Sequence, residues 1–388
     1  MKTICEICGA PAHGHHFGST TCRACSAFFR RALLTKSFRR SCKFEKNCTD
    51  FIGLKYPPCK PCRLKKCLQK GMDSKNLRNA PPMTIFKSLY LSLYPESSKE
   101  VSFISTSSNR RSFVDVHSLV SRGFELLDFG APRALNPSLT HLQKMALASS
   151  ESSGKLEKVS YISRQTGSSM WEWEFLSTAK WLTHFEEFTS LPKGIQMQLL
   201  QSIWHVWGRW SKIARSAELR KRQRKMSRNL QLYDHFYVEF ENVTVDTSWL
   251  SRHPLERIRC FMDVSDTDWK MEPFIQAMAS MDLSKVELAF MSAQLCFQYA
   301  QNRFIGTEIS SICEKFLEVI SNDLHSHYMD TGFGDMKNYA GKLAQMLKIN
   351  RGILGSIREL REMTKVAHTF DIFIADFSHP EMFVDTGC

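Results

Sequence analysis

The stretch Cys22-Arg23-Ala24-Cys25-Ser26-Ala27-Phe28-Phe29-Arg30-Arg31-Ala32-Leu33 decides the fold at the start of the chain. Read as a helix, it divides into an apolar side and a basic side. The apolar side holds Cys25, Phe28, Phe29, Ala32 and Leu33, and the opposite side holds Arg23, Ser26, Ala27 and Arg30, with Arg31 at its flank. A helix of this kind has the shape to enter the major groove of DNA, although a basic face that is only solvated is an alternative.

Cysteines flank this helix at spacings typical of metal sites. Cys5 and Cys8 form one C-x2-C pair, and Cys22 and Cys25 form another after thirteen intervening residues. Two residues between cysteines let one turn of chain bring both thiolates to about 2.3 Å from a tetrahedral zinc ion. A second set consists of Cys42, Cys48, Cys59 and Cys62. Four thiolates leave no open position, so the pattern predicts two structural Zn²⁺ ions.

Positive charge is concentrated in the same part of the chain. Residues 1–80 contain 17 Lys and Arg against 4 Asp and Glu, whereas the remainder contains 35 of each sign. A basic module beside a neutral one indicates a local contact with a polyanion such as double-stranded DNA. A basic tail that only aids solubility is the alternative, but such a tail would not be full of cysteine.

Cysteine usage and hydropathy indicate the compartment. Nine of the thirteen cysteines lie between Cys5 and Cys67. The chain starts without an apolar signal stretch and has no run of about 18 apolar residues, so we expect neither secretion nor a membrane span. In a reducing compartment, clustered cysteines bind metal more often than they form disulfides. Cys67 is one more than two sites need, and we expect it to pack in the interior.

Composition divides the chain into three segments. Residues 1–78 are dense in Cys, Lys and Arg, residues 79–112 are rich in Ser and Pro, and residues 113–388 show helical periodicity with few strand signals. We therefore predict a small α-rich module with two zinc sites, a linker, and an all-α helical bundle. Helices are expected from near Ser169 to a break at Pro192, from Met197 past Trp207, and over 284–303, 305–326 and 335–375.

The zinc module resembles a known family. The cysteine pattern followed by Phe28-Phe29-Arg30-Arg31, together with the stretch from Cys62 to Met72, is similar to the DNA-binding domain of nuclear hormone receptors, most of all to divergent nematode members. The resemblance implies that His16 and Phe17, in the loop before the helix, approach phosphate. It also implies that Arg30, Arg31 and Arg63 contact phosphate or base edges of double-stranded DNA, and that the protein acts in the nucleus.

Two departures from the family concern base readout and dimerisation. Members often have Glu after the third cysteine and Lys after the fourth, where this chain has Arg23 and Ser26. Arginine prefers guanine and serine is nearly indifferent, so the usual half-site is not expected. The loop between Cys48 and Cys59 is ten residues long, where nine are common, so homodimer or heterodimer contacts are left open.

The bundle resembles a receptor ligand-binding domain through Ala179-Lys180, Phe185, Phe188, Leu199-Leu200 and Trp204. The resemblance implies that Lys180 and, near the C-terminus, Glu381 clamp the two ends of a coregulator helix, with Asp385 as an alternative acid. An ordinary surface lysine is an equally good interpretation of Lys180. The Phe, Trp and Met content suits either a pocket for an apolar ligand or a filled core.

These features predict a sequence-specific, zinc-dependent transcription factor of the nuclear receptor type, regulated by an apolar ligand and coregulators. A second hypothesis is a receptor-like interaction protein that recruits corepressors without specific DNA readout. An enzyme is not expected, because the sequence has no phosphate loop, nucleophile elbow or open metal site. The basic run from Arg220 to Lys225 is read as a solvated loop between helices, or alternatively as an import signal.

Overall fold

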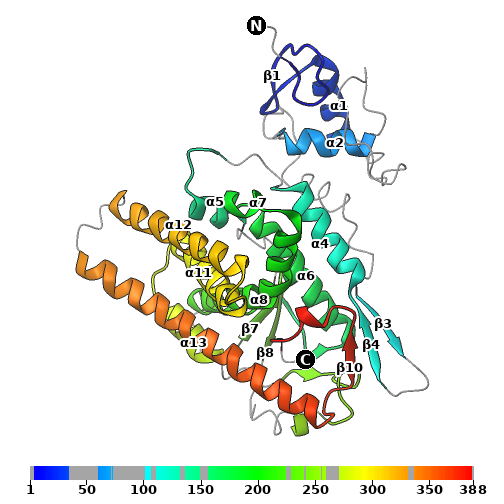
Figure 1. Ribbon diagram of the computed structural model, residues 1–388, viewed down its shortest axis with the longest axis vertical. Helices are drawn as coiled ribbons and strands as arrows, with labels where there is room; N and C mark the ends of the chain where they lie inside the picture. Colours follow the sequence, from blue (N-terminus) through cyan, green and yellow to red (C-terminus); the bar gives the residue numbers. More distant parts are fainter. Residues whose placement is uncertain are drawn as a thin grey trace. The chain divides into compact units, whose positions relative to one another are not determined.

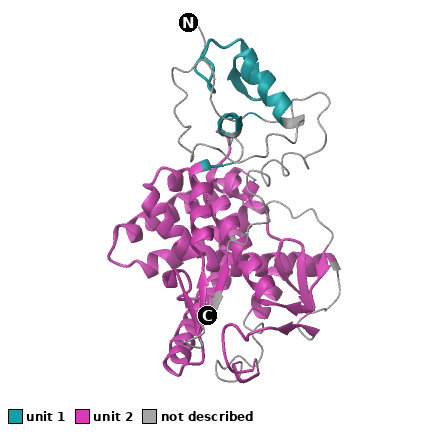
Figure 2. Ribbon diagram, turned by 90° about the vertical axis from the view of Figure 1, so that its right-hand side faces the viewer, with its two compact units in different colours: residues 1–99, 129–136 teal, residues 100–128, 137–388 magenta. Residues whose placement is uncertain are grey.

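The computed structural model forms two compact units, coloured separately in Figure 2. The first comprises Met1–Lys99 with Phe129–Asn136, and the second Glu100–Asp128 with Pro137–Cys388. The structure describes residues 4–34, 60–70, 72, 101–105, 111–131, 136–148, 156–223, 229–239, 242–254, 256–258, 271–330 and 336–386. Most of the predicted linker, 79–112, lies outside these ranges, and the predicted domain boundaries stay a prediction.

The first unit contains a hairpin followed by two helices. The hairpin pairs β1 (Gly14–His16) with β2 (Ser19–Thr21), and Phe17 and Gly18 turn between them with φ of 57° and 96°. Helix α1 (Arg23–Leu34) packs against α2 (Lys60–Gln69). Their shared core contains Ile7, Cys25, Phe28, Phe29, Ala32, Leu64, Cys67 and Met72. The apolar side predicted for α1 is therefore confirmed for every member whose burial is described.

The second unit is mainly helical (Figure 1). Its helices are α4 (His117–Phe129), α5 (His141–Ala148), α6 (Arg164–Leu182), α7 (Glu186–Thr189), α8 (Lys193–Gln223), α10 (Glu272–Ser280), α11 (Lys285–Arg303), α12 (Glu308–Asp330) and α13 (Met336–Thr369), with a short 3-10 helix, η4 (Pro380–Met382). Of the five helices expected from periodicity, four are confirmed as α8, α11, α12 and α13, although α13 ends at Thr369 and not at 375. The helix expected from near Ser169 to Pro192 is shorter, because α6 ends at Leu182 and α7 follows as a separate helix. Helices α4, α5, α7 and α10 are shorter and were not predicted.

Caps and aromatic packing explain why these helices form. The Ser163 side chain accepts a hydrogen bond from the backbone N–H of Thr166 at the start of α6, and Ser284 and Glu287 form a capping box at the start of α11. Where the end of α6 meets α11 and α12, buried rings lie in contact at centroid distances of 4.8–6.1 Å. Trp181, on α6, contacts Phe297, and Phe185, directly before α7, contacts both Phe297 and Phe316. In this region the interior is filled by side chains.

Short strands, which the periodicity did not indicate, complete the second unit. Strand β4 (Ser112–Asp115) pairs antiparallel with β3 (Ser102–Ser105) and parallel with β10 (Ala375–Phe377). Strand β8 (Phe236–Glu239) pairs with β7 (Asn229–Tyr233) and β5 (Glu157–Lys158), and β6 (Tyr161–Ile162) pairs with β9 (Thr244–Val245). The first of these sheets joins residues from both ends of the unit.

The basic run from Arg220 was expected to be a loop, and that prediction is wrong for the part that is described. Helix α8 continues through Gln223. Arg220 donates two hydrogen bonds to the Glu272 carboxylate, at 2.6 and 2.9 Å, and the Lys221 ammonium donates to the Met281 carbonyl. These contacts extend the helix and tie its end to α10; residues 224 and 225 lie outside the described ranges. No helix in the described part of the chain is both long and apolar enough to cross a bilayer.

Candidate zinc and DNA-binding site

The first predicted zinc site is assembled in the structure. The sulfur atoms of Cys5, Cys8, Cys22 and Cys25 all lie within 4.8 Å of one another, and those of Cys8 and Cys22 are 3.7 Å apart. A zinc ion with tetrahedral Zn–S bonds of about 2.3 Å requires sulfur–sulfur distances of about 3.8 Å. The four residues therefore fit a structural Zn²⁺ ion.

Backbone turns place these sulfurs. Gly9, with φ of 75°, closes the first turn by donating its N–H to the Cys5 carbonyl at 2.9 Å. At the second pair, the Cys25 N–H is 3.4 Å from the Cys22 sulfur, which accepts it. Cys22 directly precedes α1, so the first turn of this helix carries Cys25 back toward the Cys22 sulfur.

Arg63, on α2, contacts this zinc site. Its Nη2 donates a hydrogen bond to the Cys25 sulfur at 3.2 Å, and its guanidinium lies over the Phe28 ring, 4.4 Å from the centroid. A cation beside a zinc-binding thiolate neutralises part of its charge and fixes its orientation. The sequence indicated only a DNA contact for Arg63, because Cys25 is 38 residues away along the chain.

The second predicted zinc site is described only in part. Cys42, Cys48 and Cys59 lie outside the described residues, and Cys62 is half-buried on α2. Cys67, on the same helix, is fully buried, and burial raises the pKa of its thiol to about 12. A buried thiol in its neutral form suits the packing role expected for Cys67.

The opposite face of α1 presents the predicted DNA contacts to solvent. Arg23, Arg30 and Arg31 are exposed, and Ser26 is half-buried between them. Phe28 and Phe29 are buried on the other side of the helix. The zinc-binding cysteines at its start therefore fix α1 with its basic face outward, which is the arrangement that a groove-reading helix needs.

His16 and Phe17 lie in the β1–β2 hairpin. His16 is half-buried and paired with Ser19 across the hairpin. The Phe17 ring packs against Phe29, with 5.4 Å between ring centroids. A phenyl ring has no N–H or O–H group to donate to phosphate, so an approach of Phe17 to phosphate would use its backbone N–H.

In the second unit, Lys180 occupies the last turn of α6 and is half-buried. Its carbonyl oxygen accepts hydrogen bonds from Thr183 Oγ1 at 2.6 Å and His184 Nδ1 at 2.9 Å. Burial lowers the pKa of His184 to about 4, so this imidazole is neutral. The end of α6 that carries Lys180 is thereby held in a defined conformation.

The C-terminal segment, defined here as residues 379–386, is held against the helices by polar contacts. Glu381 is exposed on η4, while its carbonyl accepts a hydrogen bond from Arg303 Nη2 at 2.6 Å. The Trp204 indole N–H donates to the Met382 carbonyl at 3.1 Å. The Asp385 carboxylate is buried and is bound by Arg361 through two nitrogens and by the Tyr299 hydroxyl. Asp385 is thus committed within the fold, which leaves Glu381 as the acid available to a partner.

Comparison with known proteins follows the same division. Residues 3–74 match the family model described as a double treble clef zinc finger of the C4 type, and residues 152–370 match that for the ligand-binding domain of nuclear hormone receptors. The chain is similar to three Caenorhabditis elegans proteins that are named as nuclear hormone receptor family members. It is 45% identical to nhr-106 over the full length of both chains. It is 35% identical to nhr-130 over 99% of this chain and 92% of that protein, and 36% identical to nhr-90 over 99% of this chain and 97% of that protein.

Together, these matches indicate one type of protein. A C4 zinc finger for DNA and a ligand-binding domain in a single chain are the parts of a transcription factor and not of an enzyme, and they disfavour the second hypothesis, an interaction protein without DNA readout. The C4 finger also supports two structural zinc ions, one of them at the four cysteines described above. The chain belongs to the nuclear hormone receptor family.

Proposed function

We propose that α1 is the recognition helix of this receptor and lies in the major groove of double-stranded DNA. Arg23 and Ser26 then face base edges, and Arg30 and Arg31 contact phosphates. The observation that carries the proposal is the exposed basic face of α1 on a helix whose start is fixed by Cys22 and Cys25. The Arg23 guanidinium can donate hydrogen bonds to the O6 and N7 atoms of guanine, so the preferred half-site contains a guanine opposite this residue.

His16, Phe17 and Arg63 complete the proposed footprint. His16 and the backbone of Phe17 approach a phosphate beside the groove. Arg63 already donates to Cys25, so we assign it mainly to the orientation of the zinc-bound helix. Its mutation should then impair DNA binding through the zinc site, and mutation of Arg30 should impair it directly.

Salt-dependent DNA binding tests the proposal. The zinc-loaded full-length protein is titrated with labelled random-sequence duplex DNA at several salt concentrations, and the affinity is measured by fluorescence anisotropy. The logarithm of affinity should fall linearly with the logarithm of salt concentration, by about 0.9 for each neutralised phosphate. Arg30→Gln and Arg31→Gln should each reduce this slope by roughly one, whereas Lys348→Gln, on α13, should leave it unchanged. An affinity that does not depend on salt would refute the proposal.

We also propose that Lys180 and Glu381 clamp a coregulator helix. Support comes from their positions at the end of α6 and on η4, two elements that the surrounding hydrogen bonds hold in place. Lys180→Ala and Glu381→Ala should each abolish capture of amphipathic helical peptides selected on the wild-type protein. If both variants capture these peptides as well as the wild-type protein does, Lys180 and Glu381 do not form a coregulator clamp.

The remaining expectations belong to the same proposal. We propose that the receptor acts in the nucleus, that it binds DNA as a monomer, homodimer or heterodimer, and that an apolar small molecule regulates it. The ligand-binding domain match supports a ligand. Between α6, α11 and α12, a ligand would have to displace the Trp181, Phe185 and Phe297 rings. One or two half-sites in selected DNA would distinguish monomer from dimer binding.

A further inference from the structure

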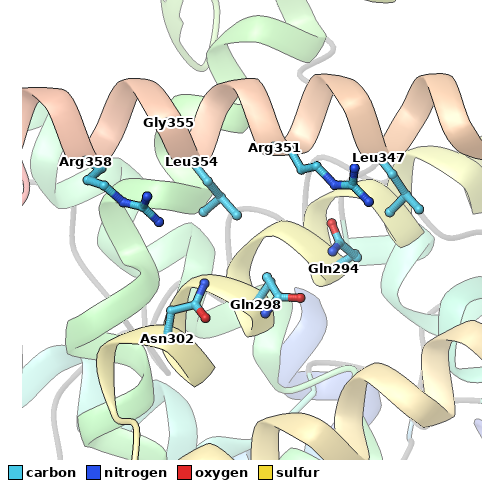
Figure 3. Close-up of a pocket in the computed structure, with 8 residues that line it drawn as sticks. All are labelled: Gln294, Gln298, Asn302, Leu347, Arg351, Leu354, Gly355 and Arg358. Carbon is cyan, nitrogen blue, oxygen red and sulfur yellow. The ribbon is translucent and has the colours of Figure 1, made fainter.

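A groove lies between α11 and α13, far along the chain from the residues assigned to DNA. Its volume is about 530 Å³. Figure 3 shows its two walls: α11 contributes the amides of Gln294, Gln298 and Asn302, and α13 contributes the guanidinium groups of Arg351 and Arg358. The groove thus combines two cations with a row of amides, and none of the described residues that line it is acidic.

The arginines repeat at a regular distance. Arg351 and Arg358 are seven residues apart, which places them on one side of α13 about 10 Å apart along its axis. Leu347 and Leu354 repeat at the same spacing and also line the groove. The wall formed by α13 therefore alternates apolar and cationic side chains over about three turns. Gly355 widens it, because nothing lies within 4 Å of the position where a side chain would begin.

Neither arginine is neutralised within the described part of the chain. Arg351 and Arg358 are exposed, and no described residue forms an ion pair or a hydrogen bond with either guanidinium. Two amides of the opposite wall already have hydrogen-bond partners. The buried Asn350 donates its Nδ2 to Gln294 Oε1 at 2.7 Å, and Gln298 Nε2 donates to Gln301 Oε1 at 2.8 Å. Two unpaired cations therefore face amides that are already positioned.

We propose that this groove binds an acidic segment of a partner protein, with two carboxylates about 10 Å apart and apolar side chains between them. The carboxylates would pair with Arg351 and Arg358. An apolar side chain between them would contact Leu354, and one beyond the carboxylate at Arg351 would contact Leu347. Amide side chains hydrogen-bond both the N–H and the C=O groups of a peptide backbone. The leucines beside the arginines favour a peptide over the phosphate backbone of a nucleic acid. This proposal does not depend on the proposed roles of α1, Lys180 or Glu381.

Peptide selection identifies the occupant. A random twelve-residue peptide library displayed on phage is selected on the zinc-loaded full-length protein, after removal of phage that bind the Arg351→Glu/Arg358→Glu variant. The expected result is enrichment of peptides with at least two acidic residues and apolar residues between them. Enrichment of neutral or basic peptides, or no enrichment over the variant, would overturn the proposal.

Affinities of the selected peptide then locate the contacts. In fluorescence anisotropy, Arg351→Gln and Arg358→Gln should each weaken binding roughly tenfold, the loss typical of one charge-assisted hydrogen bond. Lys348→Gln removes an equal charge from an exposed position of the same helix that does not line the groove, and it should change affinity less than twofold. If Lys348→Gln weakens peptide binding as much as the arginine variants do, the loss of affinity reflects net charge alone, and the proposal is overturned. Displacement of the peptide from the groove by random duplex DNA would also overturn it.

Discussion

Asp385 and Arg361 provide the sharpest test of how the C-terminal segment is held. The Asp385 side chain is fully buried, whereas the Arg361 side chain is 31% exposed. Burial alone raises the pKa of Asp385, but hydrogen bonds from Arg361 and Tyr299 outweigh it and hold that pKa below its usual range. Burial lowers the pKa of the neighbouring His205 to about 3, so His205 is neutral and Arg361 supplies the compensating charge.

The unequal exposure of the two partners predicts unequal costs. Breaking a buried ion pair typically costs about 3–5 kcal/mol, because one charge is left without a partner in the interior. Arg361→Gln leaves the buried Asp385 carboxylate without a partner and should lower the free energy of unfolding by about 3–5 kcal/mol. Asp385→Asn leaves the half-exposed Arg361, which water can solvate, and should cost roughly 2 kcal/mol. The double variant should resemble Asp385→Asn.

Tryptophan fluorescence provides the assay. All eight tryptophans lie between residues 171 and 269, so urea unfolding followed by their emission reports on the second unit and not on the zinc module. The four proteins of the double-mutant cycle give the free energies of unfolding and the coupling energy between the two sites. A larger loss for Asp385→Asn than for Arg361→Gln, or a coupling energy near zero, would refute the reasoning.

Three further predictions concern zinc, packing and pH. Arg63→Ala removes the hydrogen bond to Cys25 and should lower zinc affinity about 10- to 100-fold in competition with a chelator; an unchanged affinity would contradict the contact. Gly355→Ala should stabilise α13 by about 1 kcal/mol, because the added methyl group enters open space. Gly352→Ala would place its Cβ only 2.5 Å from a ring carbon of Phe274, and it should destabilise α13 by about 1–3 kcal/mol in the same urea assay. Burial raises the pKa of Glu287, but hydrogen bonds from Lys342 and Tyr328 outweigh this effect and lower that pKa overall. The Glu287 carboxylate should therefore stabilise the fold fully above about pH 5, and this contribution should be lost as pH falls through the lowered pKa. Glu287→Gln should flatten that part of the pH dependence of the urea midpoint.

Local features of the chain predicted the zinc module and the long helices. The thirteen residues between two C-x2-C pairs predicted a site whose four sulfurs the structure brings together. Helical periodicity predicted the long helices α8, α11 and α13. It did not predict that α8 and α11 are buried around most of their circumference, because that depends on the elements packed against them.

Contacts between distant residues could not be predicted in this way. Strand β4 pairs with β10 some 260 residues later, and neither strand is long enough to show an alternating pattern. The contact between Arg63 and Cys25 depends on how α1 packs against α2, and the ion pair between Arg361 and Asp385 depends on how the C-terminal segment packs against α13. For the same reason Asp385, read from the sequence as an alternative acid for coregulators, is buried within the fold.

Base readout by α1 depends on Arg23. The zinc-loaded full-length protein and its Arg23→Glu variant are each used to select sequences from randomised duplex DNA. We expect one enriched motif for the wild-type protein and a change at a single base pair for the variant, from guanine toward cytosine. An identical motif for both proteins, or no enrichment with zinc bound, would contradict direct readout by Arg23 and reduce the basic face of α1 to a phosphate contact.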